Sequence, residues 1–290
     1  MHYVLTLIGG QAAGAVTPAL AARVTGAVAG GPATVLAPGE AVDIPCPAAP
    51  DPAALAAALG AAPVDAVVTQ AAARRKRLLI ADMDSTIVTS ETLDELAAHA
   101  GVGAHVAAIT RRSMNGEIDF AAALRERVAL LRGLELGALE QTWAATRFTP
   151  GARELVATMR AHGAVTALVS GGFTWFTGRV AAALGFDQHR ANVLLDDGAA
   201  LLGRVAEPIL DRDAKLVALR ELAGARGLAL EDCLAVGDGA NDLAMIRAAG
   251  LGVAYHAKPI VAAEARVRIE HSDLRALLFM QGYRADEFAA

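Results

Sequence analysis

Short apolar runs alternate with helical stretches along the chain from residue 78 onward. Runs of this length, bounded by turn residues, are typical of strands buried in a parallel sheet. We expect such strands at Leu78–Ala81, Val165–Ser170, Cys233–Val236, Gly252–Tyr255 and Arg266–Ile269. The stretches between them have helical patterns, including Ala152–Ala161, Trp175–Leu184, Asp213–Ala225 and Leu243–Ala249. This alternation predicts an α/β fold with a doubly wound, Rossmann-like parallel sheet.

Residues 1–72 follow a different pattern. Strand-like and helical segments follow one another in the order Tyr3–Ile8, Pro18–Val28, Ala33–Pro45 (broken at Pro38-Gly39), Pro52–Leu59 and Val64–Thr69. This order predicts a small ferredoxin-like α+β module at the N-terminus. The module resembles the amino-acid-binding regulatory domains called ACT domains. It shows no clear ligand-binding signature, so a structural role is favoured, or a dimerising one in which two chains pair as a homodimer.

Residues 89–148 interrupt the α/β pattern after the first core strand. Four helical stretches fill this insertion, at Glu91–Ala100, His105–Ser113, Phe120–Leu131 and Leu136–Ala145, with Asp119 placed to cap the third. An all-helical insertion at this point is expected to cover the strand ends as a lid, which excludes water and selects substrates. We therefore expect residues 73–290 to form one domain, with a core of 77–88 and 149–290 and a helical cap of 89–148.

The overall charge argues against nucleic acid as a partner. The chain has 290 residues, a net charge of −5 and a pI near 5.8, without the basic surface that nucleic-acid binding requires. The cluster Arg74–Arg77 is interpreted as a solvated linker. Cys46 and Cys233 lie in no metal-binding or disulfide pattern, which favours a reduced, cytoplasmic setting. Residues 3–22 carry no charge, but glycines and a proline interrupt them, so neither a membrane span nor a signal peptide is expected.

Two aspartates, Asp82 and Asp84, directly follow the apolar run Leu78–Ala81. In open α/β sheets, ligands bind beyond the carboxyl ends of the strands. Two carboxylates there repel each other unless a metal ion or a shared proton lies between them. A site for Mg²⁺ and phosphate suits this arrangement, because the cation takes oxygen ligands and offsets the phosphate charge that would repel a carboxylate nucleophile. Taken alone, the segment is equally compatible with a helix N-cap or a calcium-like surface loop.

Three further segments carry polar side chains near predicted strand ends. Ser170-Gly171-Gly172 supplies a hydroxyl and backbone N–H groups that can approach a phosphate closely, although a plain turn has the same pattern. Lys215 lies early in a predicted helix, where its charge opposes the helix dipole, although such a lysine is usually a surface residue. The segment Gly237–Asp242, with the sequence GDGAND, places two carboxylates and an amide where they could complete a metal site with Asp82.

Together, the four segments resemble the four motifs of the haloacid dehalogenase superfamily of phosphotransferases, over about residues 78–280. The resemblance implies that Asp82 attacks phosphorus to give an aspartyl-phosphate, and that Asp84 protonates the leaving oxygen and later activates water. It also implies that Mg²⁺ is bound by the carboxylates of Asp82 and Asp238 and by the backbone carbonyl of Asp84. The remaining implied contacts are to the phosphate, from Ser170, the N–H of Gly171, Lys215 and Asn241, with Asp242 supporting the metal or Lys215.

The cap resembles the branch of this superfamily that hydrolyses O-phospho-L-serine, the last step of L-serine biosynthesis. The matching segments are Glu91–Leu96, Met114–Gly116, Asp119–Phe120, Leu124–Val128, Ser170–Phe173 and Ala257–Pro259. Such a substrate carries an ammonium and a carboxylate, for which the resemblance assigns Glu91 and Arg127. Without the resemblance, both would be ordinary charges on solvated helix faces. Helical geometry points Arg125 about 200° away from Arg127, and Met114 and Phe120 are expected to line the apolar side of the cap.

Two other functions fit parts of the pattern. A phosphatase of the same superfamily could act on phosphothreonine, phosphohomoserine or a vitamin phosphate, and only Glu91 and Arg127 argue against this. A non-catalytic amino-acid sensor would bind its ligand in the N-terminal module and use the core as a scaffold. Clustered charges at Asp82, Asp84 and Lys215 argue against a disused site, because such a cluster is costly to maintain.

The assignment of Arg127 gives a first prediction. Replacing Arg127 by alanine should raise KM for O-phospho-L-serine at least tenfold, because a bidentate contact to the substrate carboxylate is lost. Hydrolysis of an aryl phosphate, which has no carboxylate, should stay nearly unchanged. Steady-state kinetics with both substrates would measure the difference, and an equal loss on both would contradict the assignment.

Overall fold

A computed structural model of the chain describes residues 2–11, 14–114, 117–211 and 213–289 and contains two sheets and a hairpin. The larger sheet has six strands in the order β12-β11-β10-β5-β6-β7, and neighbouring strands are parallel. The strands are β5 (Leu78–Ala81), β6 (Val165–Phe173), β7 (Gln188–Asn192), β10 (Cys233–Gly237), β11 (Leu251–Tyr255) and β12 (Val267–Ile269). The predicted doubly wound parallel sheet is confirmed.

One edge of this sheet differs from the sequence-based expectation. The pattern predicts one strand over Ala191–Leu195, whereas β7 ends at Asn192 and β8 (Leu194–Asp196) begins two residues later. The turn residues Asp196-Asp197-Gly198, flanked by Ala191–Leu195 and Ala200–Val205, also predict a hairpin. The structure has this hairpin, in which β8 pairs with β9 (Leu201–Val205). β7 begins with exposed polar residues, because an edge strand does not need the continuous apolar run of a central parallel strand. Its start therefore has no clear sequence signal.

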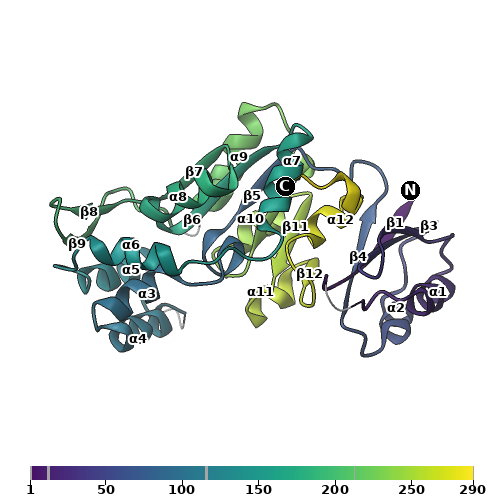
Figure 1. Cartoon of the computed structure of the whole chain (residues 1–290), viewed down its shortest axis with the longest axis horizontal. Coiled ribbons are helices and arrows are strands. Elements are labelled where there is room, and N and C mark those ends of the chain that lie inside the picture. The colour runs from purple at the N-terminus through teal and green to yellow at the C-terminus, as the bar shows by residue number, and fades with distance from the viewer. Residues whose placement is uncertain (1, 12–13, 115–116, 212, 290) are drawn as a thin grey trace.

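Helices cover both faces of the sheet (Figure 1). On one face, α7 (Ala152–Ala161), α8 (Thr174–Leu184) and α12 (Ala276–Phe279) form an apolar cluster with Leu79 of β5. On the other face, α9 (Ala214–Ala225), α10 (Leu243–Ala248) and α11 (Pro259–Glu264) pack with Leu78 and Ile80. Successive side chains of a strand point to opposite faces, so β5 contributes to both clusters. Its four residues are fully buried, and each large apolar side chain stabilises the fold by about 1.5–3 kcal/mol.

The predicted insertion forms four helices at one end of the molecule (Figure 1). They are α3 (Thr92–His99), α4 (Gly103–Met114), α5 (Phe120–Ala129) and α6 (Gly137–Ala145). As expected, the side chain of Asp119 caps α5 by accepting the N–H of Ala122 at 2.8 Å. The segment between α5 and α6 is bonded to the β8–β9 hairpin, since Gly133 N–H donates to the Leu201 carbonyl and Leu201 N–H donates to the Leu134 carbonyl. The hairpin thus supports the far end of the cap.

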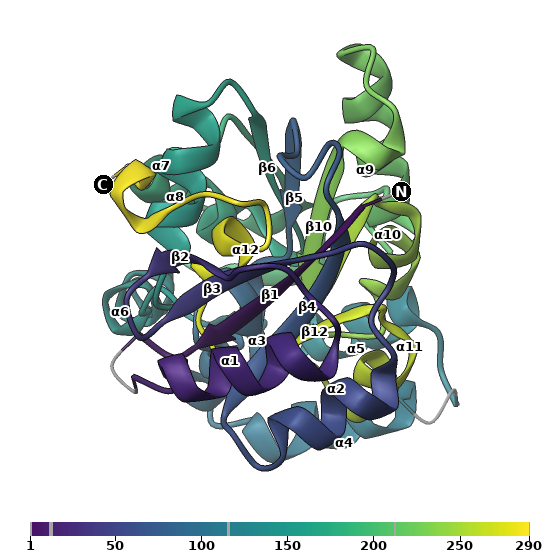
Figure 2. The same cartoon turned by 90° about the vertical axis from the view of Figure 1, so that its right-hand side faces the viewer.

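The N-terminal elements form a four-stranded antiparallel sheet in the order β2-β3-β1-β4. The strands are β1 (Tyr3–Gly9), β2 (Thr34–Ala37), β3 (Ala41–Cys46) and β4 (Val64–Gln70), and the helices are α1 (Pro18–Ala27) and α2 (Pro52–Leu59). Figure 2 shows both helices on the outer face of this sheet. The inner face packs against the core, where Ile8, Leu36 and Val67 join the cluster that contains α12. The predicted ferredoxin-like order of elements is confirmed.

Buried polar contacts join the N-terminal sheet to the core. Arg74, in the linker, contacts Asp43 of β3 at 2.6 Å, and Arg275 contacts Glu40 at 2.9 Å. Asp65 of β4 accepts the backbone N–H groups of Glu270, His271 and Ser272 at 2.8–3.3 Å. Buried charges of this kind are stable only when they are paired. The sequence suggests that Arg74–Arg77 form a solvated linker. In the structure, however, the Arg74 side chain is largely buried and belongs to the interface between the N-terminal sheet and the core.

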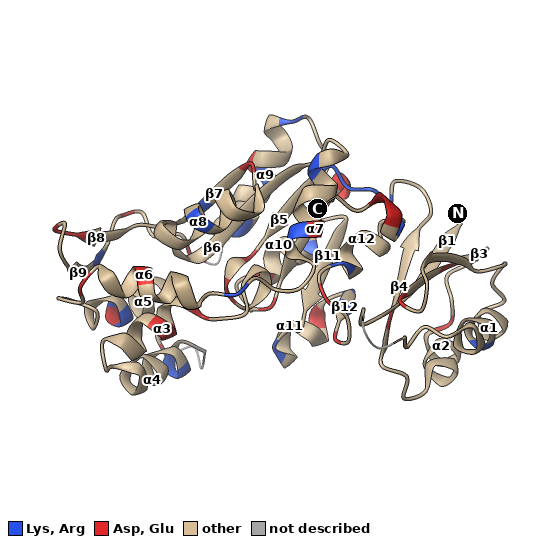
Figure 3. Ribbon diagram, in the orientation of Figure 1, with Lys and Arg blue, Asp and Glu red and all other residues tan. Residues whose placement is uncertain are grey.

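Charges of both signs are interspersed over the molecule (Figure 3). Within the described residues, no helix has both the length and the apolar character that a bilayer crossing would demand.

The contacts of Asp65 give a stability prediction. Replacing Asp65 by alanine should lower the free energy of unfolding by at least about 3 kcal/mol, because buried N–H groups lose their acceptor. Asp51 provides a matched control, since it accepts the N–H of Ala54 at an exposed helix N-cap, where alanine costs about 1 kcal/mol. Urea denaturation of both variants would measure the difference, and equal losses would contradict the role given to Asp65.

Candidate active site

Three neighbouring strands deliver polar side chains to the same edge of the sheet. Asp82 follows β5, Ser170 lies near the end of β6, and Asp238 follows β10, and these strands are adjacent in the order β10-β5-β6. The N–H of Asp82 donates to the carbonyl of Val236 at 3.0 Å, so the end of β5 is aligned with β10. All three side chains are at least nine-tenths buried. The structure therefore brings together residues that are far apart in the sequence.

Lys215 lies between the carboxylates of Asp82 and Asp242, the latter just before α10. Its Nζ is 2.6 Å from Asp82 Oδ1 and 2.6 Å from Asp242 Oδ1, and the lysine is 2% exposed. Burial alone would lower the pKa of Lys215, but the charges of Asp242 and Asp82 outweigh it and raise the pKa above its ordinary value. The ammonium therefore stays charged, which explains why a lysine occupies the first turn of α9.

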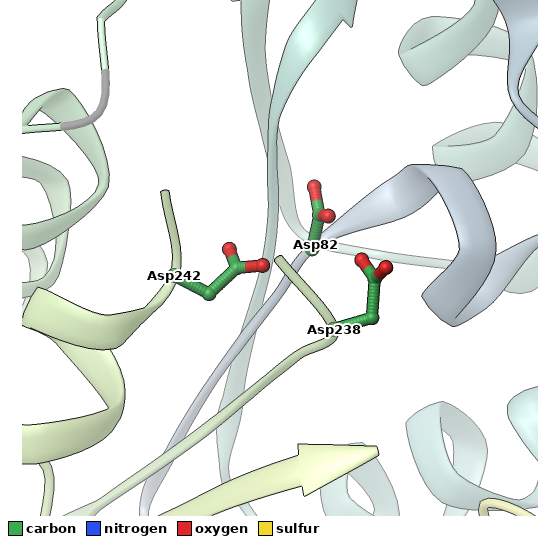
Figure 4. Close-up of side chains that lie close together, drawn as sticks. All are labelled: Asp82, Asp238 and Asp242. Carbon is green, nitrogen blue, oxygen red and sulfur yellow. The ribbon is translucent and has the colours of Figure 1, made fainter. Parts of the chain in front are cut away.

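Asp82, Asp238 and Asp242 form a buried acidic cluster (Figure 4). One carboxylate oxygen of each lies within 4.8 Å of the others. Both oxygens of Asp242 are engaged, because Oδ1 contacts Lys215 and Oδ2 accepts the N–H of Gly239 at 3.0 Å. Burial, followed by the charge of Asp82, raises the pKa of Asp238. A cation between Asp82 and Asp238 would relieve this repulsion, and hard carboxylate oxygens are the donors that Mg²⁺ prefers.

Asp84 lies apart from that cluster and contacts the cap. Its Oδ1 accepts the N–H of Thr92, the first residue of α3, at 2.9 Å, and its Oδ2 accepts a hydrogen bond from Ser170 Oγ at 3.3 Å. Burial, then the charges of Glu91 and Asp82, raise the pKa of Asp84 to about 7. This carboxyl can therefore hold a proton near neutral pH, as a general acid must. Sequence reasoning assigned no role to Thr92, because its contact with Asp84 is made by the backbone.

The glycines after Ser170 allow close approach of the backbone. A Cβ on Gly172 would lie 2.8 Å from Asp84 Oδ2, and a Cβ on Gly171 would lie 3.0 Å from the Phe120 ring of the cap. The N–H of Gly172 donates to Ser170 Oγ at 2.9 Å. The end of β6 therefore fits between Asp84 and the Phe120 ring of the cap because these two positions lack side chains.

The two cap residues expected to select the substrate face the same region. Glu91 Oε1 accepts a hydrogen bond from Ser85 at 2.9 Å, and burial raises the pKa of Glu91. Arg127 donates to the carbonyl of Ala123 at 3.2 Å. Burial lowers the pKa of Arg127, while the nearby charges of Asp94 and Glu91 act in the opposite direction. Among the described residues, no carboxylate lies within ion-pair distance of its guanidinium, so a charged group of a ligand could still bind there.

Arg125 lies on the other side of α5, as helical geometry predicts. Its Nη2 pairs with Glu207 at 2.7 Å on the surface. Phe120 packs against the buried core cluster and lies over Gly171. The side chain of Met114 lies outside the described residues, as do Asn115 and Gly116, so the contact expected of Met114 stays a prediction.

Two remaining residues border the acidic cluster. Asn241 is half-buried and lies beside Gly239. A Cβ at position 239 would collide with the amide oxygen of Asn241. Lys258 Nζ lies 3.5 Å from Asp238 Oδ2, and the N–H of Lys258 donates to the carbonyl of Asp238 at 3.1 Å. The motif Ala257-Lys258-Pro259 is visible in the sequence, but sequence reasoning assigned no role to this lysine. Its contact depends on the packing of the loops that follow β10 and β11.

Comparison with known proteins identifies the family. The model of the haloacid dehalogenase-like hydrolases matches residues 79–247, a span that contains Asp82, Ser170, Lys215 and Asp238. The chain therefore belongs to the haloacid dehalogenase-like hydrolases.

Individual relatives and solved structures show which members of this family the chain resembles. A phosphoserine phosphatase of Streptomyces coelicolor is 43% identical over 237 residues, which cover 81% of this chain and 57% of that protein. The chain thus spans little more than half the length of this relative. A solved structure of a probable phosphoserine phosphatase from Vibrio cholerae, in unliganded form, has 31% identity and a TM-score of 0.80, and the match covers 97% of this chain and 86% of that one. A solved phospho-aspartyl intermediate analogue of phosphoserine phosphatase has 41% identity and a TM-score of 0.66, over 71% of this chain and 98% of that one.

The raised pKa of Asp84 gives a prediction about stability and pH. The unfolded chain releases this proton near the ordinary value of 3.8, whereas the folded chain keeps it up to about pH 7. The stabilisation from the neutral carboxyl is therefore complete below about pH 4 and is lost as the pH rises through 7. Asparagine stays neutral, so Asp84→Asn should gain about 2 kcal/mol of stability relative to the unmodified chain between pH 5 and pH 8.

Denaturation with a metal chelator present would measure this gain. Asp94→Asn changes an exposed carboxylate on α3 and serves as the control, for which the difference from the unmodified chain should hardly change with pH. A pH-independent difference for Asp84→Asn would show that the carboxyl is already ionised at pH 5.

Proposed function

We propose that this chain is a phosphoserine phosphatase, which hydrolyses O-phospho-L-serine to L-serine and inorganic phosphate. The observation that supports the proposal most directly is that two neighbouring carboxylates after β5, those of Asp82 and Asp84, lie in different electrostatic environments. Asp82 is held by a charged lysine, and Asp84 has a pKa of about 7. A nucleophile must be ionised and a general acid must be protonated, so the two environments suit the two roles.

The proposed reaction has two displacements at phosphorus. In the first, a carboxylate oxygen of Asp82 forms a bond to phosphorus, the bond from phosphorus to the serine oxygen breaks, and Asp84 gives its proton to that oxygen. In the second, Asp84 takes a proton from water, the water oxygen attacks phosphorus, and the aspartyl-phosphate bond breaks. Phosphate leaves, and both aspartates return to their starting state. The solved phospho-aspartyl analogue of a phosphoserine phosphatase supports this route.

Neighbouring residues would hold the transferred group. We assign the Ser170 hydroxyl, the Gly171 N–H, Lys215 and Asn241 to the phosphate oxygens. Phosphoryl transfer depends mainly on positioning and on charge compensation, so these donors would contribute a large part of the rate. Asp242 would support Lys215, because both of its oxygens are already engaged.

Asp82 and Asp238 would hold Mg²⁺, with the backbone carbonyl of Asp84 as a further ligand. When bound there, Mg²⁺ supplies positive charge between the nucleophile and the phosphate. The buried carboxylate oxygens fit this ion by chemical type, and their mutual repulsion favours binding of a cation.

Substrate choice is proposed to depend on the cap. Glu91 would bind the substrate ammonium and Arg127 its carboxylate, and the charge of Glu91 already acts on Arg127. The relatives named as phosphoserine phosphatases support this substrate. A phosphatase for phosphothreonine or phosphohomoserine is the second candidate, because the catalytic residues would be the same. Comparison of kcat/KM over a panel of phosphomonoesters distinguishes the two.

We also propose the division into a module of residues 1–72 and a domain of residues 73–290, with the cap at 89–148. The separate sheets support it, and so does the position of the helical insertion directly after β5. A homodimer formed through the N-terminal module stays a prediction.

The proposal predicts release of inorganic phosphate from O-phospho-L-serine that requires both Mg²⁺ and Asp82. Asp82→Asn should lower kcat by at least about 10³-fold, because the amide cannot form the acyl-phosphate. A phosphate assay with and without a chelator would measure both effects, with Asp51→Asn at the exposed N-cap of α2 as the control. Turnover that survives in Asp82→Asn would contradict the assignment of the nucleophile, and turnover unchanged by the chelator would contradict the metal requirement.

A further inference from the structure

The peptide group between Gly171 and Gly172 is held from both sides. Its N–H, which belongs to Gly172, donates to Ser170 Oγ at 2.9 Å. Its carbonyl, which belongs to Gly171, accepts a hydrogen bond from Asn192 Nδ2 at 2.9 Å. Glycine has more backbone freedom than any other residue, so a peptide between two glycines can rotate easily unless its polar atoms are held. Asn192 and Ser170 restrict this rotation.

Asn192 also binds the segment that leads to Lys215. It is the last residue of β7, is 2% exposed, and accepts the N–H of Leu210 on its Oδ1 at 2.8 Å. Leu210 lies between β9 and α9, and Lys215 is in the first turn of α9. A single buried amide therefore connects the loop of Ser170 and Gly171 to the segment that positions Lys215.

These hydrogen bonds also determine the direction in which the Ser170 hydroxyl donates its proton. Because Ser170 Oγ accepts the N–H of Gly172, its own proton is free to point elsewhere, and it is directed to Asp84 Oδ2 at 3.3 Å. If the peptide rotated, the N–H of Gly172 would leave Ser170, and the carbonyl of Gly171 would leave Asn192. The Ser170 hydroxyl would then lose the N–H that holds its oxygen, and the backbone on the C-terminal side of Gly171 would no longer be held in one arrangement.

We propose that Asn192 is a positioning residue for the phosphate site. It holds the Gly171–Gly172 peptide and the segment before α9, so that the donors of both loops face one phosphate group. The inference rests on the proposed function, which assigns these donors to phosphate. An amide suits this position, because its nitrogen donates to the Gly171 carbonyl while its oxygen accepts the Leu210 N–H. A carboxylate could accept from Leu210 but could not donate to Gly171.

Gln281 offers a matched control for the loss of a buried amide. It is 1% exposed, its Nε2 donates to the carbonyl of Leu277 at 2.7 Å, and its Oε1 accepts the N–H of Lys76 at 2.9 Å. Lys76 precedes β5, so this amide lies toward the amino ends of the strands, away from Ser170 and Gly171 near the end of β6. Asn192→Leu and Gln281→Leu each remove two hydrogen bonds from a buried side chain to backbone groups.

The experiment measures the affinity for inorganic phosphate by calorimetry in the presence of Mg²⁺, together with the midpoint of thermal unfolding. Both leucine variants should unfold at a lower temperature, since each leaves two backbone groups next to a buried side chain without their partners. Only Asn192→Leu should also raise the Kd for phosphate, by about tenfold. Asn192→Asp should raise this Kd as well, because it keeps the bond to Leu210 and loses the bond to Gly171.

The outcomes separate the possible explanations. If Asn192→Leu binds phosphate within twofold of the unmodified chain while it is as destabilised as Gln281→Leu, then Asn192 is only structural and the inference is wrong. Asn192→Ser, which is too short to reach Gly171, takes the place of the leucine variant if that variant does not fold, and it is judged by the same Kd. If the unmodified chain itself neither binds phosphate nor releases it from O-phospho-L-serine, then the proposed function has failed, which is a different result.

Discussion

The ammonium of Lys215 between Asp82 and Asp242 is the interaction on which the rest of the site depends. Three buried carboxylates within 4.8 Å of one another would repel strongly in a region from which water is excluded. One lysine at 2.6 Å from two of them compensates part of this charge, and the proposed Mg²⁺ between Asp82 and Asp238 would compensate more of it. Removing one partner of such a buried pair is much more costly than removing a surface pair, because the remaining charge stays buried without compensation.

The second organising feature is the junction between the core and the cap. Asp84 binds the N–H of Thr92 at the start of α3, and Ser85 binds Glu91 immediately before it. The residue expected to transfer the proton and the residue expected to bind the substrate ammonium are therefore held at one short turn. On the opposite side, Phe120 lies over Gly171. The cap thus contacts both Gly171 and Asp84, so the proposed substrate selection by the cap would be connected to the proposed general acid.

Sequence reasoning predicted the parallel sheet, the helical insertion and the N-terminal α+β module, because continuous apolar runs and capped helices are local signals. β5, α2 and α7 have the predicted bounds. The start of β7 was not predicted, since an edge strand with polar residues lacks the apolar run of a central strand. Asn192, Thr92 and Lys258 were also not assigned roles. Each acts through backbone groups or through a residue far away in the chain, and neither kind of contact leaves a pattern in the neighbouring sequence.

The amino-acid sequence by itself determined which chemical groups follow which strands, because strand periodicity and the order of motifs are encoded locally. It therefore indicated Asp82, Asp84, Ser170, Lys215 and Asp238 as one site. Only the tertiary structure decided that the two carboxylate oxygens of Asp242 bind Lys215 and the N–H of Gly239. It also decided that Asp84 is buried enough for its pKa to reach about 7. These properties depend on distances of a few ångströms and on the exclusion of water, which arise only when the separate segments pack together.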